Sequence, residues 1–469
     1  MEEEKVAMEQ TISQNKMGMQ SVSKLMLGMG IPMIISMMVQ AFYNIVDSYF
    51  VSNIADADGV ANMGDYAVNA LTLSFPVQML IIAIGVGTGV GVNALLSRSL
   101  GAGQQEQANR VAGNAIFVGI CTYVVFLLFG LFGVRWFLET QTSDPIILEL
   151  GYEYLSICSI VSFGAVGSMI YEKLLQSTGK TVFSTIAQLA GAIANVVLDP
   201  ILIYGWLGAP EMGITGAAVA TVIGQILTLV LSMVFHYGWN REINGSPRYL
   251  KPDGKTISRI YKVGAPAILM QALMSVMAYG VNIIFGLVSA SAVTAYGIYY
   301  KIQQFVFFAA FGLNNAIIPI VAFNYGKNDR KRVQDGVRYG LLYTLLLMLI
   351  GAVGLQLFAK PICGVFALSE ESQMLCIRAI RVVTFGYLFA GANIAFQGIF
   401  QALGCGMKSL VLSLIRLIVV ALPLAWCLTL VDDAANMVWL AFPIAEGCGF
   451  VVALVLMRIV AKAKIEKLK

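Results

Sequence analysis

The stretch Pro32–Ser52, PMIISMMVQAFYNIVDSYFVS, connects an apolar run to a polar loop. Most of its residues suit lipid, but Tyr43, Asn44 and Asp47 do not, and their spacing places them on one face of a helix. A carboxylate inside a membrane is costly unless it meets a cavity, a cation or a proton. We therefore expect Asp47 to be the coupling residue of a transporter, with Gln40, Tyr43 and Asn44 lining the substrate cavity.

Pro32 stands near the start of the same predicted helix. Proline has no backbone N–H to donate, and its ring disturbs the preceding turn, so the helix can bend at this position. We expect Pro32 to act as a hinge.

The rest of the chain is equally apolar. Of its 469 residues, 58% are hydrophobic and 12% are charged, whereas a soluble domain has about 25% charged residues. Apolar runs of about 20 residues recur along the whole length, and the alternation typical of barrel strands is absent. The sequence predicts an all-α polytopic membrane protein with about twelve transmembrane helices. We place them at 25–50, 67–96, 108–134, 147–173, 181–204, 213–239, 259–286, 292–322, 335–358, 372–402, 409–430 and 436–460.

Basic residues are distributed unevenly between the two sides of the predicted membrane. Of the 30 lysines and arginines, Arg135 and Lys360 are the ones that fall in loops opposite the termini. Because basic residues accumulate in cytoplasmic loops, both termini are expected in the cytoplasm. The expected organisation is a cytoplasmic N-terminal segment (1–24), an N-lobe (25–239), a cytoplasmic linker (240–258), a C-lobe (259–460) and a basic cytoplasmic tail (461–469).

The two halves of the chain are repeats. One constant offset in residue number relates Gly87 to Gly312, Gly101 to Gly326 and Gln176 to Gln401, and a slightly longer offset relates Pro32 to Pro266. Halves of six spans have the same orientation in the membrane, so a pseudo-two-fold axis along the membrane normal relates the two lobes. Two six-helix lobes around a central cavity suit transport by alternating access.

A second carboxylate, Asp199, lies near the outer end of the fifth span, with Asn195 one turn earlier on the same face. Asp47 lies at a comparable depth, and the repeat places Val281 and Leu424 at the corresponding positions of the second half. One interpretation is that both acids cap helix ends at the interface. The other is a shared proton or sodium site, because neighbouring carboxylates raise each other's pKa.

Three further charged residues, Glu446, Arg416 and Lys301, reach a similar depth in the second half, roughly 12–15 Å from a membrane surface. A structural ion pair between Glu446 and either Arg416 or Lys301 is one interpretation. A second titrating or substrate-contacting site is the other.

Motifs of enzymes are missing from the chain. It has no HExxH, GxSxG, GxxxxGK[ST] or paired CxxC sequence, and its single histidine, His236, argues against a membrane-embedded transferase. We expect no enzymatic activity, no organic cofactor and no nucleic-acid partner. Without an ATP site, transport must draw on an ion gradient, with a proton or sodium as the coupling ion, or on the gradient of the substrate.

Several stretches together resemble the multidrug and toxic compound extrusion (MATE) family, and the resemblance covers nearly the whole chain. They are YNIVDSYFVS, SRSLGAGQQEQANRVAGNA, NVVLDPILIYG followed by MGITGAAVATVIGQ, and FQALGCGMKSLVLSLIRLIVVALPLAW. The resemblance implies two six-helix lobes around a central cleft and cation-driven efflux of amphipathic, often cationic, organic compounds. The chain resembles bacterial members most, so we expect a monomer in the lipid bilayer of a bacterial cytoplasmic (inner) membrane. Buried cations in the second half leave anionic and zwitterionic substrates open.

The resemblance also assigns roles to individual residues. Asp47 matches the family's helix 1 aspartate and Pro32 its bend; Asp199 and Asn195 match the helix 5 pair of a cation site; Tyr154 and Thr221 match the tyrosine and threonine of that site. Neither the seventh nor the tenth span has an acid in its interior, which favours coupling in the first lobe. The alternative is a lipid-linked-sugar flippase of the same superfamily, although such proteins usually have about two more helices.

Overall fold

The computed structural model describes residues 15–54, 63–366 and 369–469, with the side chain of Asn44 outside the described part. Residues 1–14 of the predicted N-terminal segment also lie outside it. Within the described ranges all regular structure is helical. In the described part of the chain, eleven helices are long and apolar enough to cross a membrane, and there are twelve if the bent pair of α7 and α8 forms one span. The predicted fold class is therefore confirmed.

The helices divide into two groups of six spans. The first contains α3 (Val22–Ser52), α4 (Met63–Gly101), α5 (Gln105–Phe132), α6 (Val134–Glu139), α7 (Pro145–Ile160), α8 (Phe163–Ser177), α9 (Thr181–Ile203) and α10 (Gly213–Trp239). The second contains α11 (Gly254–Gly286), α12 (Ala290–Gly326), α13 (Arg330–Gly364), α14 (Glu370–Val383), α15 (Tyr387–Ala402), α16 (Gly406–Leu414), η4 (Ile415–Val420), α17 (Ala421–Leu428), α18 (Ala434–Met437) and α19 (Ala441–Val460). We call these groups the N-lobe and the C-lobe. Several helices exceed the predicted spans; α4 has 39 residues, about 58 Å, and so extends beyond the hydrocarbon core.

Several of the predicted spans are not regular α-helices, and three of them are interrupted in their interior. The fourth bends by 42° between α7 and α8. A 3₁₀ turn, η3 (Thr384–Gly386), interrupts the tenth, and the backbone of Gly386 lies close to Pro443. The eleventh contains the π-helical turn η4. Such interruptions often mark functional positions, and none of them follows from hydropathy.

Reciprocal contacts between the lobes confirm the predicted pseudo-two-fold relation. A Cβ on Gly101 would collide with the carbonyl oxygen of Phe323, and a Cβ on Gly326 would collide with that of Arg98. The offset of the repeat that relates the two glycines also relates Arg98 to Phe323. Each lobe therefore presents the same surface to the other across a local two-fold axis.

A second reciprocal contact uses both offsets of the repeat. A Cβ on Gly87 would lie 2.7 Å from the backbone nitrogen of Ile268, and a Cβ on Gly312 would lie 2.7 Å from the Cα of Ile34. The shorter offset relates the two glycines, and the longer offset, shared with the two prolines of the repeat, relates the two isoleucines. Helix α4 thus crosses α11 as α12 crosses α3, with glycine permitting the close approach in both cases.

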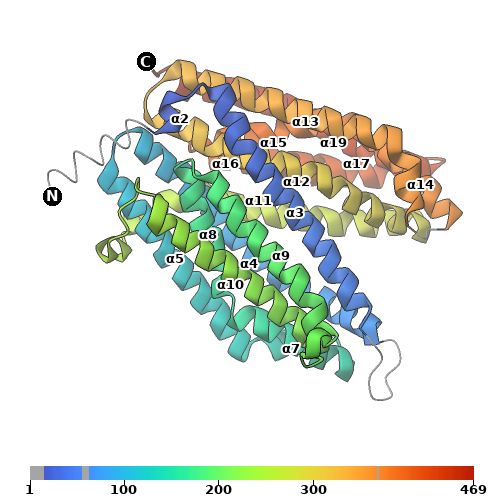
Figure 1. Ribbon diagram of the computed structural model, residues 1–469. Coiled ribbons are helices and arrows are strands. Elements are labelled where there is room, and N and C mark those ends of the chain that lie inside the picture. The colour runs from blue at the N-terminus through green and yellow to red at the C-terminus, as the bar shows by residue number, and fades with distance from the viewer. Residues whose placement is uncertain (1–14, 55–62, 367–368) are drawn as a thin grey trace.

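The lobes are joined at one end only. One buried apolar cluster contains residues of both lobes, such as Leu25, Leu100, Ile260 and Ile317, whereas the other three clusters each draw on a single lobe. The joined end holds α2 (Lys16–Met19) and the C-terminus, and we call it the terminal end. In Figure 1 the lobes lie together there and spread apart toward the opposite, far end.

The segment before α3 lies across the terminal end and bonds to both lobes. On the N-lobe side, the Asn15 amide donates to the Thr178 carbonyl at 3.2 Å. On the C-lobe side, Arg332 donates to the carbonyl oxygens of Met17 and Gln20 at 2.8 and 2.7 Å. Met17 is fully buried. We call residues 15–20 the strap.

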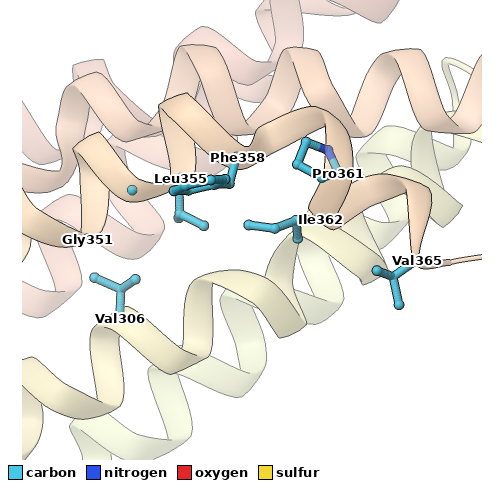
Figure 2. A pocket seen from close by; sticks show the side chains of 8 residues that line it. Val306, Gly351, Leu355, Phe358, Pro361, Ile362 and Val365 are labelled. Atoms are coloured by element: carbon cyan, nitrogen blue, oxygen red, sulfur yellow. The ribbon is translucent and has the colours of Figure 1, made fainter.

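An apolar pocket of about 450 Å³ lies on the C-lobe between α12 and α13 (Figure 2). Val306 of α12 faces Gly351, Leu355, Phe358 and Ile362 of α13 across it. All the lining residues are apolar, so this pocket offers no group that could hold an ion.

Candidate functional site

The polar site of the N-lobe is built on α9 and α10. Asn195 and Asp199 are one turn apart on α9, and the Asn195 amide nitrogen lies 3.3 Å from Asp199 Oδ1. The same nitrogen lies 3.5 Å from the Thr221 hydroxyl of α10. Asp199 is completely buried, and Asn195 is 3% exposed. The structure thus brings together three of the residues that the sequence assigned to one site.

Helix packing explains why these side chains meet. A Cβ on Gly191 of α9 would lie 2.5 Å from the carbonyl oxygen of Gly224 of α10, so the two helices are nearly in backbone contact. Such close crossings need small residues on both helices. The crossing lies one turn from Asn195 on α9 and directs its amide toward Thr221.

Asp47 completes the group from α3, near the Ser52 end of its helix. Its carboxylate is close enough to that of Asp199 for the two charges to interact, and the Tyr43 hydroxyl is within electrostatic range of both. Helix α3 packs directly on α9. The structure therefore places the two acids in one polar region near the far end rather than apart.

Three buried oxygens of this region have no hydrogen-bond donor within the described part of the chain. They are Asp47 Oδ1, Asn195 Oδ1 and Asp199 Oδ2. Each such group costs about 1–3 kcal/mol, and more when it carries charge. Oxygens of this kind are the ligands that an alkali or alkaline-earth cation prefers, and a proton would neutralise a carboxylate and turn one of its oxygens into a donor.

Tyr154 of α7 borders the same region. It is 3% exposed, its hydroxyl accepts a hydrogen bond from the Gln78 amide at 3.0 Å, and it lies within electrostatic range of Asp47. Gln78 of α4 and Cys158 of α7, which is also within electrostatic range of Asp47, were not among the predicted residues. Gln78 is a polar residue inside an apolar span, and that signal was present in the sequence.

The remaining predicted N-lobe residues lie on α3. Gln40 and Tyr43 are half-buried, and their side chains are within hydrogen-bonding reach of each other. Pro32 lies inside α3, which is helical on both sides of it. Asn44 belongs to the same helix, but its side chain lies outside the described part, so its place in a cavity stays a prediction.

In the C-lobe, Glu446 and Arg416 form an ion pair. Arg416 Nη1 donates to both carboxylate oxygens, at 2.7 and 2.8 Å, and Asn393 donates to Glu446 Oε2 at 2.8 Å. Arg416 is 4% exposed. Of the two partners that the sequence allowed, Arg416 therefore makes the contact. Lys301 is exposed, and no ion pair joins it to Glu446 in the described ranges.

A further buried cation lies between the lobes and was not singled out from the sequence. Lys173 of α8 is 4% exposed; its ammonium group donates to Gln176 at 2.8 Å and to Asn315 of the C-lobe at 3.3 Å. Glu172 lies 3.6 Å from it. The sequence placed Lys173 at a membrane surface, because hydropathy does not reveal that another lobe covers it.

Clusters typical of transition-metal sites are not present: no group of three or more His, Cys, Asp or Glu side chains gathers within the described residues. The polar region of Asp47, Asp199 and Asn195 offers two carboxylates and an amide, which are the groups that could hold a proton or an alkali cation.

A sequence model of the MatE family matches residues 32–201 and 266–427, one segment in each lobe. The chain belongs to the MatE family. The two matched segments begin at Pro32 and Pro266, which occupy equivalent positions of the repeat.

Curated relatives of this MatE protein match along most of its length. The multidrug export protein MepA of Staphylococcus saprophyticus is 22% identical over 89% of this chain and 90% of the relative. MepA of Staphylococcus haemolyticus is 22% identical over 92% of both chains. These relatives are transport proteins and not enzymes, as the sequence predicts for this chain.

Solved structures share the fold. An outward-facing multidrug resistance MATE family transporter of the MOP superfamily superposes with a TM-score of 0.90 at 23% identity, over 97% of this chain and 98% of the other. A MOP superfamily transporter from Pyrococcus furiosus, whose binding pocket of reversed polarity is said to suggest a different function, gives 0.86 at 24% identity over 96% and 98%. At this identity the likeness supports the fold of a multi-pass membrane protein.

Proposed function

We propose that this MatE protein is a secondary active exporter of organic compounds, driven by entry of protons or sodium into the N-lobe. The observation that carries the proposal is the group of three undonated oxygens on Asp47, Asn195 and Asp199. Two neighbouring carboxylates that have no basic partner in the described ranges form a site that gains stability when a cation or a proton arrives. Tyr154 and Thr221 border this site.

Coupling requires that the occupied and empty sites favour different states of the transporter. Asp47 is on α3, which packs on α9 of its own lobe and on α12 of the other. Neutralising the two acids removes their mutual repulsion and lets α3 approach α9 at the far end. This movement of α3 at the far end then changes its contact with α12 at the terminal end, and Pro32 is the hinge between these two parts of the helix.

The position of the basic loops assigns one side of the membrane to each end of the molecule. With the terminal end in the cytoplasm, a structure closed there is the outward-facing state of an inner-membrane transporter. Alternating access then consists of opening the terminal end while the far end closes.

Amphipathic, often cationic, compounds are the proposed substrates, because the curated relatives are named multidrug export proteins. Those names do not favour the lipid-linked-sugar flippase. Anionic compounds remain open as substrates. The buried Arg416 of the C-lobe does not favour them, because its charge is already paired with Glu446.

Transport by purified protein in proteoliposomes, with proton and sodium gradients imposed separately, tests the proposal. We expect accumulation of a cationic dye with one of the two gradients and loss of that gradient-driven transport in Asp47→Asn. Asp65→Asn is the matched control, because Asp65 is an exposed aspartate of the same lobe on α4. Equal gradient-driven transport by the Asp47 variant and the wild type would refute the coupling role.

A further inference from the structure

The Glu446–Arg416 pair of the C-lobe is largely buried, and both oxygens of the carboxylate accept hydrogen bonds, although Arg416 Nε and Asn393 Oδ1 have no partner in the described structure. The two carboxylate oxygens receive donors from Arg416 and Asn393, and Asn393 also donates to the backbone carbonyl of Glu446 at 3.0 Å. Arg416 belongs to the π-helical turn η4. In the described structure, both oxygens of the Glu446 carboxylate therefore accept a hydrogen bond.

The repeat aligns this pair with the polar site of the N-lobe. Helices α10 and α19 correspond at the shorter offset of the repeat, which relates Ala220 to Ala445, Gly224 to Gly449, and the sequence Leu-Val-Leu at 229–231 to the same sequence at 454–456. The same offset, which relates Gln176 to Gln401, extends along α9 into α16 and η4. Glu446 therefore stands where the N-lobe has Thr221, and Arg416 stands where it has Gly191.

Packing at the two helix crossings supports this correspondence. In the N-lobe, Gly191 lies against Gly224, where a Cβ would meet a backbone oxygen at 2.5 Å. In the C-lobe, a Cβ on Gly449 would lie 3.0 Å from the Cβ of Arg416. The same helix pair crosses at the same place in both lobes, and in the C-lobe an arginine side chain starts from this crossing.

The two lobes satisfy their acids in opposite ways. In the N-lobe, Asp47, Asn195 and Asp199 each keep an undonated oxygen within the described structure. In the C-lobe, a guanidinium fixed to the chain supplies the positive charge that Glu446 needs. A covalently held cation cannot be exchanged during transport, whereas a proton or a sodium ion can.

We propose that Arg416 is a built-in counter-cation that fills, in the C-lobe, the place a mobile cation takes in the N-lobe, so that its removal turns Glu446 into a new site for a proton or a sodium ion. The comparison with the N-lobe rests on the proposed function, but the behaviour of Glu446 without Arg416 does not. The pair thereby restricts ion exchange to one lobe.

The physical reason is the cost of an unpaired charge in a buried position. Removing one partner of a buried ion pair is strongly destabilising because the other charge stays uncompensated. A carboxylate can escape that cost by binding a proton or a cation, and an arginine cannot, because it does not lose its proton in proteins. The two single variants should therefore respond differently to pH and sodium.

Few other titratable groups face this pair. Helix α19 packs on α15, α16, η4 and α17, and also on α14, η3, η5 (Val438–Leu440) and η6 (Ala461–Ile465). The charged residues of α14, which are Glu370, Glu371, Arg378 and Arg381, are all exposed. From α15 comes Tyr387, whose hydroxyl lies 3.5 Å from that of Tyr299 of α12, and Tyr299 is within electrostatic range of Glu446. Cys427 of α17 is exposed, and Lys408 lies at the start of α16. Among the described residues of these elements, Glu446 is the only carboxylate that is not exposed.

The test compares the thermal unfolding midpoint of purified Arg416→Met, Glu446→Gln and the double variant with that of the wild type, at low and high pH and with or without sodium. The midpoint of each variant is compared with that of the wild type under the same condition. This subtraction removes the response of the N-lobe acids, which all four proteins share. We expect Arg416→Met to be destabilised by several degrees at high pH without sodium, and low pH or sodium to restore most of that loss. Glu446→Gln should be destabilised equally under all conditions, and the double variant should respond as the wild type does.

A loss of stability in Arg416→Met that is the same at every pH and sodium concentration would overturn the proposal. Purification of Arg416→Met that succeeds only at low pH or in high sodium would support the proposal. If Arg416→Met cannot be purified under either condition while the double variant folds normally, the proposal is wrong. The double variant should also keep ion-driven transport in proteoliposomes. Loss of ion-driven transport in a folded double variant would show that the pair takes part in coupling. Failure of the N-lobe proposal would appear instead as normal transport by Asp47→Asn, and it would leave the unfolding midpoints of the Arg416 and Glu446 variants unchanged.

Discussion

Gly326 of α12 and Arg98 of α4 meet at the terminal end so closely that any Cβ on residue 326 would collide with the Arg98 carbonyl oxygen. The same contact recurs between Gly101 and Phe323, and the two contacts flank the local two-fold axis. A joint that depends on backbone contact has little tolerance for added atoms. It closes the terminal end only while both glycines are present.

We expect Gly326→Ala to weaken this closure. Overpacking costs about 1–3 kcal/mol, which corresponds to a shift of about 5- to 150-fold in the equilibrium between the two states. The measurement is the rate at which a maleimide labels Ser97→Cys, a buried position of the terminal end, in a background without the native cysteines. Gly28→Ala is the control, because its Cβ would have no neighbour within 4 Å. Identical labelling rates in the two variants would contradict the role of the joint.

A disulfide across the lobes should trap the state described. A Cβ on Gly30 of α3 would lie 3.9 Å from the Cβ of Ala316 of α12, within the range of disulfides. We expect Gly30→Cys with Ala316→Cys to cross-link under mild oxidation, to lose transport, and to regain it after reduction. The control is a staple within one lobe: a Cβ on Gly151 would also lie 3.9 Å from the Cβ of Ala70. Transport that survives the interlobe cross-link would argue against alternating access.

Arg332 of α13 makes the shortest hydrogen bonds between the strap and the C-lobe, beside those from Asn324 to Met17 and from Lys327 to Gly18. Arg332 donates to the carbonyl oxygens of Met17 and Gln20, and its Nε donates to Asn324 Oδ1 at 2.7 Å. Hydrogen bonds from a charged group contribute about 1.5–3 kcal/mol each, so Arg332→Met should release the strap. Maleimide labelling of Met17→Cys, which is buried in the parent protein, measures the release.

Arg332→Lys separates charge from geometry in the same assay. A lysine keeps the positive charge but lacks the planar fork that reaches several acceptors, so it should release the strap almost as fully. Slow labelling in both variants would mean that apolar packing of Met17 holds the strap.

Asp199→Asn should change the ion dependence of transport and leave the fold intact. An amide at this position removes one of the two carboxylates and so reduces the attraction for a cation, while it can still pair with the Asn195 side chain 3.3 Å away. Transport driven separately by proton and sodium gradients is the measurement. A variant whose response to both gradients equals that of the wild type would exclude Asp199 from coupling.

The candidate site could be found from the sequence to a limited extent. Asp47 and Asp199 are recognisable because a carboxylate in an apolar span is costly wherever the helix packs. Gln78 gives a weaker signal of the same kind, and only its bond to Tyr154 reveals its place. Lys173 gives a misleading signal, since a lysine at the end of an apolar run has the same pattern whether water or a second lobe covers it.

The sequence by itself determined the all-helical class, the twelve spans and the two-fold repeat, because hydropathy and the constant offset between equivalent residues are properties of the chain that survive any packing. Only the tertiary structure decided that Glu446 pairs with Arg416 rather than Lys301, that Asp47 lies near Asp199, and that the lobes join at the terminal end. The reason is that a side chain's partner depends on how distant helices cross. Those crossings depend on contacts between glycine backbones, such as Gly326 with Arg98, and no local pattern records them.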